Sequence, residues 1–155
     1  MDRRLLQNLG NIRVPRVLDL EQGRFVDYNH QAEQLFEMPP DQLNRFGPAD
    51  LSPEFQPDGR RSTESAQAYV AQAVAGDMPT FEWTHRSHTG REIPCEVRLA
   101  RLPAQGRTLI RGSLTDITER RRTAEALARS EQSYRELFEQ ANDAIFLCAA
   151  DGRLL

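Results

Sequence analysis

The sequence has few cysteines, no long apolar run and no strong excess of charge of either sign. Two cysteines, Cys95 and Cys148, are too few for a disulfide framework and suit a reducing compartment. The apolar runs are too short to span a bilayer, and the N-terminal stretch MDRRLLQNLGN lacks the apolar core of a signal peptide. A net charge of −3 gives no electrostatic reason to expect binding to nucleic acid or to an anionic membrane. We therefore expect a cytoplasmic protein with no membrane segment in this chain.

The sequence motifs of catalysis are also missing. It contains no glycine-rich phosphate loop, no nucleophile elbow and no zinc-ligand spacing. His85 and His88 are three residues apart on a strand and its turn, so they should point to opposite faces and cannot share a metal, whereas His30 is expected to be solvated. Cys95 is expected on an inward apolar face, where a thiol is inert. We expect a protein that is not an enzyme and that binds no metal.

The first half of the chain predicts two strands and then small helices. With 155 residues, 39% of them hydrophobic, it has room for one domain with a good core and a short additional piece. Residues 16–20 and 24–28 read as strands joined by a turn at Gly23. Asn29 is placed to cap a short helix, and residues 39–61 are rich in Pro, Gly and polar groups, so only short helical turns are expected there.

The second half predicts a longer helix followed by three strands. The helix starts at Ser62 or Thr63 and ends at Gly76, and its apolar residues recur at helical spacing: Ala66, Tyr69, Val70, Ala73 and Val74. The strands span 80–87, 92–102 and 108–116, with short connections that predict an antiparallel meander. Alternation places one set of side chains on the inner face: Phe81, Trp83, His85, Ile93, Cys95, Val97, Leu99, Ile110, Gly112 and Leu114.

This order of elements resembles the PAS domain family. The resemblance is carried by three stretches of the sequence: LDLEQGRFVDYNHQAEQLF, FEWTHRSHTGREIPCEVRLA and IRGSLTDITERRRTAEAL. The most specific feature is a strand that ends in Asp116-Ile117-Thr118 and leads into a basic helix. The resemblance implies an α+β fold, with a five-stranded antiparallel sheet, small helices on one face and a long C-terminal signalling helix. The predicted division is an N-terminal helical segment (1–11), a PAS domain (12–118), a connector helix (119–142) and the truncated start of a second PAS domain (143–155).

The last segment is predicted from an internal repeat. RVLDLEQGRF resembles IFLCAADGRL, with Gly23 matching Gly152, and LLQNLGN resembles LFEQAND. The two matches differ in spacing by three residues, which predicts three extra residues at 14–16, between the helix and the strand of the first copy. We therefore expect a fragment of a longer protein with tandem PAS domains.

The resemblance implies a ligand cavity between the sheet and the small helices. The candidate pocket residues are Leu35, Val70, Phe81, Trp83, Cys95, Val97, Ile110 and Leu114. The alternative is that most of them form an ordinary core. The indole N–H of Trp83 needs a partner if it is buried, and that partner could be a ligand, a water or a backbone carbonyl of a covering loop.

Comparison with cofactor-binding relatives predicts no cofactor. Flavin photosensors of the family carry a reactive Cys where this chain reads FGPADLSPEF, and a Gln where it has Leu114. Haem-binding members supply a His from the longer helix, and residues 62–75 contain none. A small organic ligand, or no ligand, is expected, and flavin without cysteine chemistry remains an alternative.

The connector helix is expected to transmit the regulatory signal out of the PAS domain. Residues 118–142 contain no Pro or Gly and are rich in helix-forming residues. Thr118 can cap the helix, and the carboxylate of Asp116 can bind its first N–H groups or an arginine of 120–122. Heptad spacing of Ala124, Glu131 and Phe138, and of Leu127, Tyr134 and Ala141, predicts a parallel coiled-coil homodimer. The alternative is that the helix packs on its own domain or on the next one.

These observations predict a sensory module that binds a small ligand or a partner. Asp116, Thr118 and Leu127 would relay the signal to a missing output domain, a histidine kinase or a cyclic-dinucleotide enzyme. The alternatives are a ligand-free dimerisation or relay module and a flavin or haem redox sensor.

Overall fold

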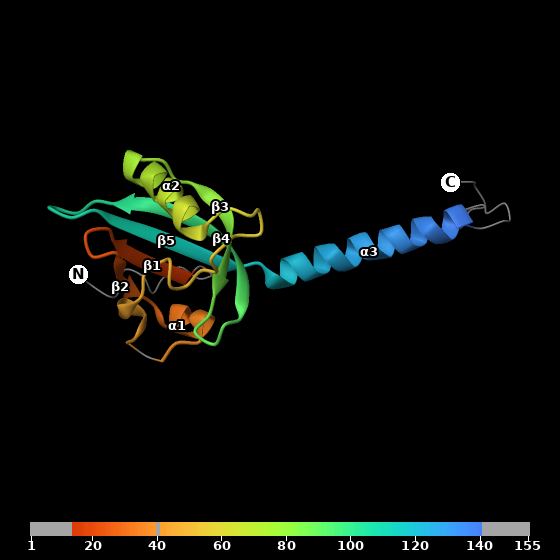
Figure 1. The fold of residues 1–155 in the computed structure, drawn as a ribbon, viewed down its shortest axis with the longest axis horizontal. Coiled ribbons are helices and arrows are strands. Elements are labelled where there is room, and N and C mark those ends of the chain that lie inside the picture. Colours follow the sequence, from red (N-terminus) through yellow and green to blue (C-terminus); the bar gives the residue numbers. More distant parts are fainter. Residues whose placement is uncertain (1–13, 40, 141–155) are drawn as a thin grey trace, which may run out of the picture. The chain divides into compact units, whose positions relative to one another are not determined.

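The computed structural model describes residues 14–39 and 41–140. They fall into two compact units that divide after Thr118, and the first contains a five-stranded antiparallel sheet with helices (Figure 1). In chain order the elements are β1 (Val14–Asp19), β2 (Arg24–Tyr28), α1 (His30–Phe36), the 3₁₀ helix η2 (Leu43–Arg45), α2 (Ser62–Ala75), β3 (Thr80–Arg86), β4 (Glu92–Leu102), β5 (Leu109–Asp116) and α3 (Thr118–Gln140). The predicted α+β fold and its order of elements are confirmed. The predictions for 1–11 and 143–155 lie outside the described residues.

The strands are ordered β2-β1-β5-β4-β3, so the first and last strands of the unit pair near the middle of the sheet. β3, β4 and β5 form the predicted meander, in which Gly90 takes the left-handed conformation (φ 91°) that the turn requires. The first strand begins two residues earlier than predicted, at Val14 and not at Arg16, because β5 pairs along it from Val14 onwards. The three extra residues predicted at 14–16 therefore belong to β1. Arg16 lies directly opposite Gly112 in this register.

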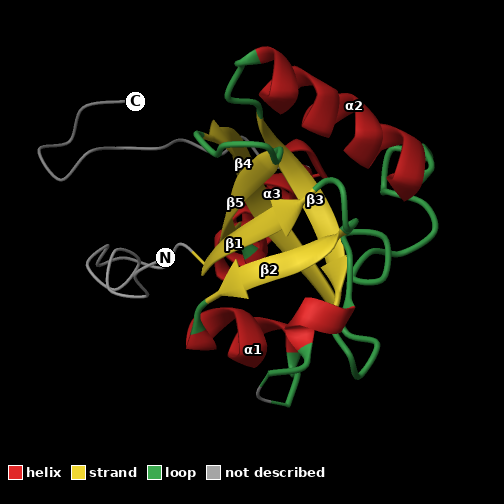
Figure 2. Ribbon diagram, turned by 90° about the vertical axis from the view of Figure 1, so that its left-hand side faces the viewer, coloured by secondary structure: helices red, strands yellow, loops and turns green. Residues whose placement is uncertain are grey.

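The two shorter helices contact different strands. Asn29 caps α1 as predicted, because its side-chain oxygen accepts the N–H of Ala32 at 3.1 Å. α2 ends at Gly76 (φ 107°), also as predicted. α1 packs against β1, whereas α2 packs against β4 and β5 (Figure 2). Within the described residues, no helix has the length and hydropathy that crossing a bilayer requires.

The segment before α2 contributes more to the core than its polar composition predicts. Leu43 of η2 and Leu51 are at most 1% exposed. The buried amide of Gln56 accepts the backbone N–H of Thr84 at 2.8 Å and donates to its carbonyl at 3.2 Å. This side chain therefore extends the hydrogen bonding of β3 beyond the sheet edge. The segment is fixed against the strand that lines the site described next.

Candidate functional site

A cavity of about 60 Å³ lies between the sheet and the elements that cover it. Its walls come from all five strands, α2 and the loop before α2: Arg16, Leu18, Phe25, Pro48, Ala66, Val70, Phe81, Trp83, His85, Val97, Leu99, Ile110 and Gly112. Most of these residues are apolar. Two of them, Arg16 and His85, bring polar side chains into an otherwise apolar enclosure.

Five of the eight predicted pocket residues line this cavity: Val70, Phe81, Trp83, Val97 and Ile110. The other three lie elsewhere. Cys95 and Leu114 are fully buried in the core, and Leu35 is partly buried against it, but none of them lines the cavity. Alternation along the strands identified the correct face of the sheet, but it could not show which part of that face remains uncovered.

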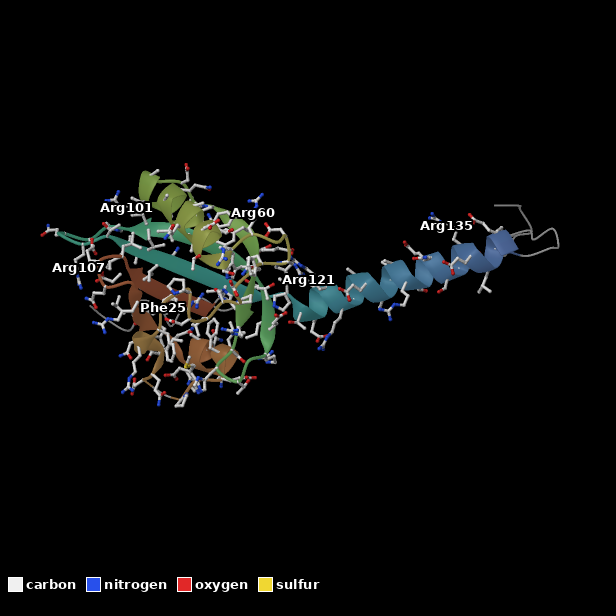
Figure 3. The ribbon with its side chains drawn as sticks, in the orientation of Figure 1. Phe25, Arg60, Arg101, Arg107, Arg121 and Arg135 are labelled. Carbon is white, nitrogen blue, oxygen red and sulfur yellow. The ribbon has the colours of Figure 1, made fainter. Side chains whose placement is uncertain are left out.

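Sequence reasoning missed the most unusual residue of the site, Arg16. Its side chain is 5% exposed, and its guanidinium carbon lies 4.6 Å from the ring centroid of Phe25 and 4.7 Å from that of Phe36. Burial lowers the pKa of Arg16 to about 9, so it still carries its positive charge at pH 7. Other arginines, such as Arg60 and Arg101, lie at the surface (Figure 3). The local pattern gave no signal for it, because consecutive residues of β1 are buried on both faces of the sheet.

His85 lies next to Arg16 and is also buried, at 4% exposed. Its Nδ1 is 3.1 Å from the carbonyl oxygen of Leu51, and its Nε2 is 3.4 Å from Nη2 of Arg16. A carbonyl only accepts and a guanidinium only donates, so the hydrogen is on Nδ1 and the ring is neutral. Burial and, next, the charge of Arg16 lower the pKa of His85 well below its ordinary value. His85 therefore orients Arg16 without neutralising it.

Trp83 closes the cavity on the side of the loop before α2. Its indole N–H donates to the hydroxyl of Ser52 at 3.0 Å, and that hydroxyl donates to the carbonyl of Pro48 at 2.8 Å. The partner is thus a side chain, not the backbone carbonyl that one interpretation of the sequence expected. Next to it, the ring of Tyr69 from α2 stacks on Phe81 with centroids 3.5 Å apart. These contacts attach both the loop and α2 to β3.

Two of the three described histidines, His85 and His30, have both ring nitrogens engaged and offer little to a haem or a metal. Both nitrogens of His85 are engaged, and those of His30 lie 2.9 Å from Glu33 and 3.1 Å from Gln34. Among the residues that the structure describes, no three metal-binding side chains form a cluster. Burial and the nearby Asp116 raise the pKa of the Cys95 thiol to about 12, so it stays protonated. The expectation of no cofactor remains a prediction.

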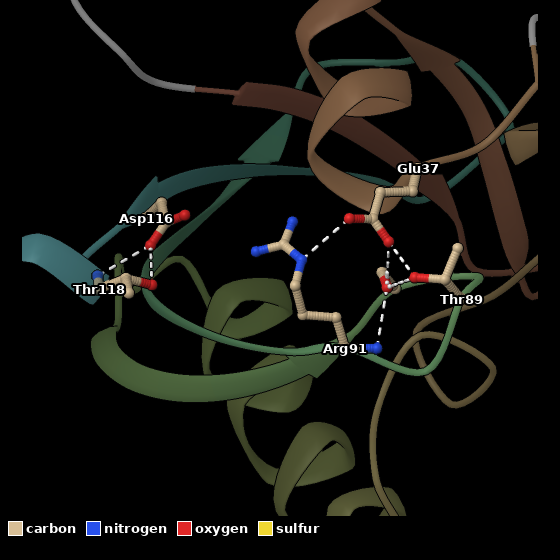
Figure 4. A network of polar contacts seen from close by, with 6 residues as sticks. Glu37, Thr89, Arg91, Asp116 and Thr118 are labelled. Carbon is tan, nitrogen blue, oxygen red and sulfur yellow. Dashed lines mark hydrogen bonds and ion pairs between the residues drawn. The ribbon is translucent and has the colours of Figure 1, made fainter.

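The end of β5 is bonded to the start of α3. Asp116 Oδ1 accepts the backbone N–H of Thr118 at 2.8 Å and its hydroxyl at 2.6 Å (Figure 4). The carboxylate of Asp116 therefore binds the first N–H of α3, as predicted, and Thr118 is the first residue of the helix. Because β5 also lines the cavity with Ile110 and Gly112, one strand connects the cavity to the helix.

A second polar network holds α1 against the β3–β4 turn. Glu37, which follows α1, accepts hydrogen bonds from Ser87 at 2.8 Å, from Thr89 and from Arg91 Nε at 2.9 Å (Figure 4). These bonds lower the pKa of Glu37. They fix the end of the helix that supplies Phe36 to the surroundings of Arg16.

Comparison with known proteins agrees with this architecture. Comparison with curated proteins finds no match. Among solved structures, the PAS domain of nitrogen regulation protein NR(II) from Vibrio parahaemolyticus is 18% identical with a TM-score of 0.57, over 74% of this chain and 95% of that one. A domain of a sensory box sensor histidine kinase/response regulator from Geobacter sulfurreducens is 23% identical with a TM-score of 0.55, over 69% and 85% of the two chains.

A third similar structure is the N-terminal domain of a diguanylate cyclase with PAS/PAC sensor from Marinobacter aquaeolei, which is 14% identical with a TM-score of 0.55, over 70% and 98% of the two chains. At these identities the structural similarity supports the fold alone. A family profile for the PAS fold matches residues 17–122, which is more than half of the chain and includes the whole sheet from Val17 onwards. The chain therefore belongs to the PAS fold family.

Proposed function

We propose that this chain is a cytoplasmic, non-enzymatic sensory module that binds a small molecule in its cavity and relays the bound state through α3. The cavity beside Arg16 and Trp83 is the observation that carries the proposal. The similar structures include domains named for a sensor histidine kinase and for a diguanylate cyclase, which are the two output classes that we propose for the parent protein.

The relay would run along β5. Ile110 and Gly112 line the cavity, and Asp116 at the end of the same strand binds the first N–H of α3. A ligand that favours one position of β5 would shift the population of helix positions by its difference in affinity for the two states.

We also propose that α3 pairs with a second copy of the chain. Apolar side chains at its heptad positions are exposed in the single chain: Leu127 by 61%, Tyr134 by 55% and Phe138 by 37%. Most of the stability of a helix in a protein comes from packing of its apolar face, so covering these side chains would stabilise α3.

A ligand-free relay module is the second candidate, and the size of the cavity favours it. About 60 Å³ is well below the roughly 300–1,000 Å³ of typical ligand pockets. A relay module would pass on movements of a neighbouring domain without binding anything itself.

Hydrogen exchange separates the two candidates. The chain would be titrated with a panel of small acids, amides and alcohols while backbone amide signals and exchange rates are followed by NMR. A sensor should show saturable shifts at Gly112 together with altered exchange in the first turn of α3. Asp116→Ala should keep the first response and weaken the second. If no compound shifts the cavity signals, the sensory function is refuted in favour of the relay module.

A further inference from the structure

The cavity has one positively charged wall, formed by Arg16 of β1. Across the sheet, Arg16 faces Gly112 of β5, where any other residue would place its Cβ roughly 4.5–5.5 Å from that of Arg16. A Cβ added to Gly112 would meet only Leu99 at 3.5 Å and the carbonyl oxygen of Arg16 at 4.0 Å. The missing side chain therefore leaves room beside the arginine.

No anion in the described part of the chain neutralises this charge. Nε and Nη1 of Arg16 have no hydrogen-bond partner, and Nη2 has the neutral His85 ring at 3.4 Å. Asp19, the buried acid on the same strand, is bonded elsewhere, to two backbone N–H groups and to Arg107 at 3.3 Å. Burying a charge without a counter-ion is among the most unfavourable arrangements in a protein interior.

The neighbouring side chains fix the position of the guanidinium but do not satisfy all of its hydrogen-bond donors. The rings of Phe25 and Phe36 attract its charge, and His85 fixes one of its nitrogens. None of these groups accepts a hydrogen bond from Nε or Nη1. The site thus keeps two oriented, unused donors buried beside an apolar cavity, and a small anion next to them would complete their hydrogen bonding.

We propose that the ligand of this cavity is a small carboxylate of two or three carbons, bound through its carboxylate to Arg16. This inference rests on the proposed sensory function and specifies its ligand class. A planar carboxylate accepts parallel hydrogen bonds from a guanidinium, and its carbon atoms would contact Phe81, Val97 and Ile110. The volume of about 60 Å³ holds roughly four to six water-sized spheres, which suits acetate or propionate.

The test compares propionate with its neutral analogue. Sodium propionate, propionamide and sodium chloride would be titrated into the full chain at constant ionic strength and followed by ¹H–¹⁵N NMR, including the Nε–H signal of Arg16. Propionate should give saturable shifts at this signal and at the amide of Gly112, with an affinity at least about tenfold above that of propionamide. Chloride should not saturate the same signals.

Arg16→Met is the decisive variant, and Arg111→Met is its matched control. Arg111 pairs with Val17, which is the position next to the Arg16–Gly112 pair. Because successive side chains of a strand point to opposite faces, Arg111 is on the other face of the sheet. Arg16→Met should abolish propionate binding and leave the melting temperature of the ligand-free protein unchanged or higher, because it removes an uncompensated buried charge. Arg111→Met removes the same charge and should keep the binding.

The outcomes separate this inference from the proposed function. Saturable binding of propionamide but not propionate would overturn the carboxylate ligand and leave the sensory function standing. Propionate binding that survives Arg16→Met would also overturn it. If neither compound binds and Gly112→Ala raises the melting temperature by filling the space, both the inference and the sensory function fail.

Discussion

Ser52→Ala tests whether the loop before α2 is held over the cavity by the indole of Trp83. Trp83 and Ser52 are 7% and 4% exposed, so the substitution leaves the indole N–H buried without its acceptor, and the Pro48 carbonyl loses its donor. An unsatisfied buried donor costs about 1–3 kcal/mol. We expect the free energy of unfolding to fall by about 2 kcal/mol. The melting temperature should fall by about 4–8 °C per kcal/mol for a unit of this size.

The assay is urea unfolding followed by far-UV circular dichroism, with the fluorescence of Trp83, the only tryptophan, as a second probe. Trp83→Phe provides the control, because it removes the donor. In the Trp83→Phe protein, Ser52→Ala should lower the free energy of unfolding by about 1 kcal/mol less than it does in the wild type. If Ser52→Ala costs the same in both backgrounds, the hydrogen bond does not hold the loop and the argument is wrong.

Three further predictions concern α3, the cofactor state and Cys95. Leu127→Asp should shift the protein towards monomer in sedimentation with little change in far-UV signal, whereas a wild type that is monomeric at high concentration would contradict the proposed dimer. Purified protein should show no visible absorption band, and a stoichiometric haem or flavin spectrum would refute this. Because the pKa of Cys95 is raised from 9.0 to about 12, the free energy of unfolding should fall as the pH rises from 9.0 towards 12. Urea unfolding of Cys95→Ala should lack this part of the pH dependence.

The sequence predicted the elements well because their signals are local. Alternation along β4 and β5, the cap at Asn29 and the glycine at the end of α2 all depend on residues close in the chain. The predicted inner face of the sheet was correct for the same reason.

The polar part of the site could not be predicted in this way. β1 is buried on both faces, since Val17 is 3% and Leu18 8% exposed, so alternation does not separate an inner from an outer side. The space beside Arg16 depends on its pairing with Gly112, which is almost a hundred residues away. The loop contacts of Ser52 and Trp83 are similarly non-local. The polar part of the site therefore depends on how distant strands pair, whereas its apolar walls follow from the alternation of residues along each strand.

The strand order has a consequence for how this unit folds. β5 is the last of the five described strands to be synthesised, yet it lies between β1 and β4 in the sheet. Until residues up to Asp116 have left the ribosome, β1 and β4 have no common neighbour, and the β1–β2 hairpin alone is at best marginally stable in water. Joining β1 to β5 closes a long loop, a step that slows folding. The nascent chain therefore acquires its cavity and its connection to α3 in the same late event.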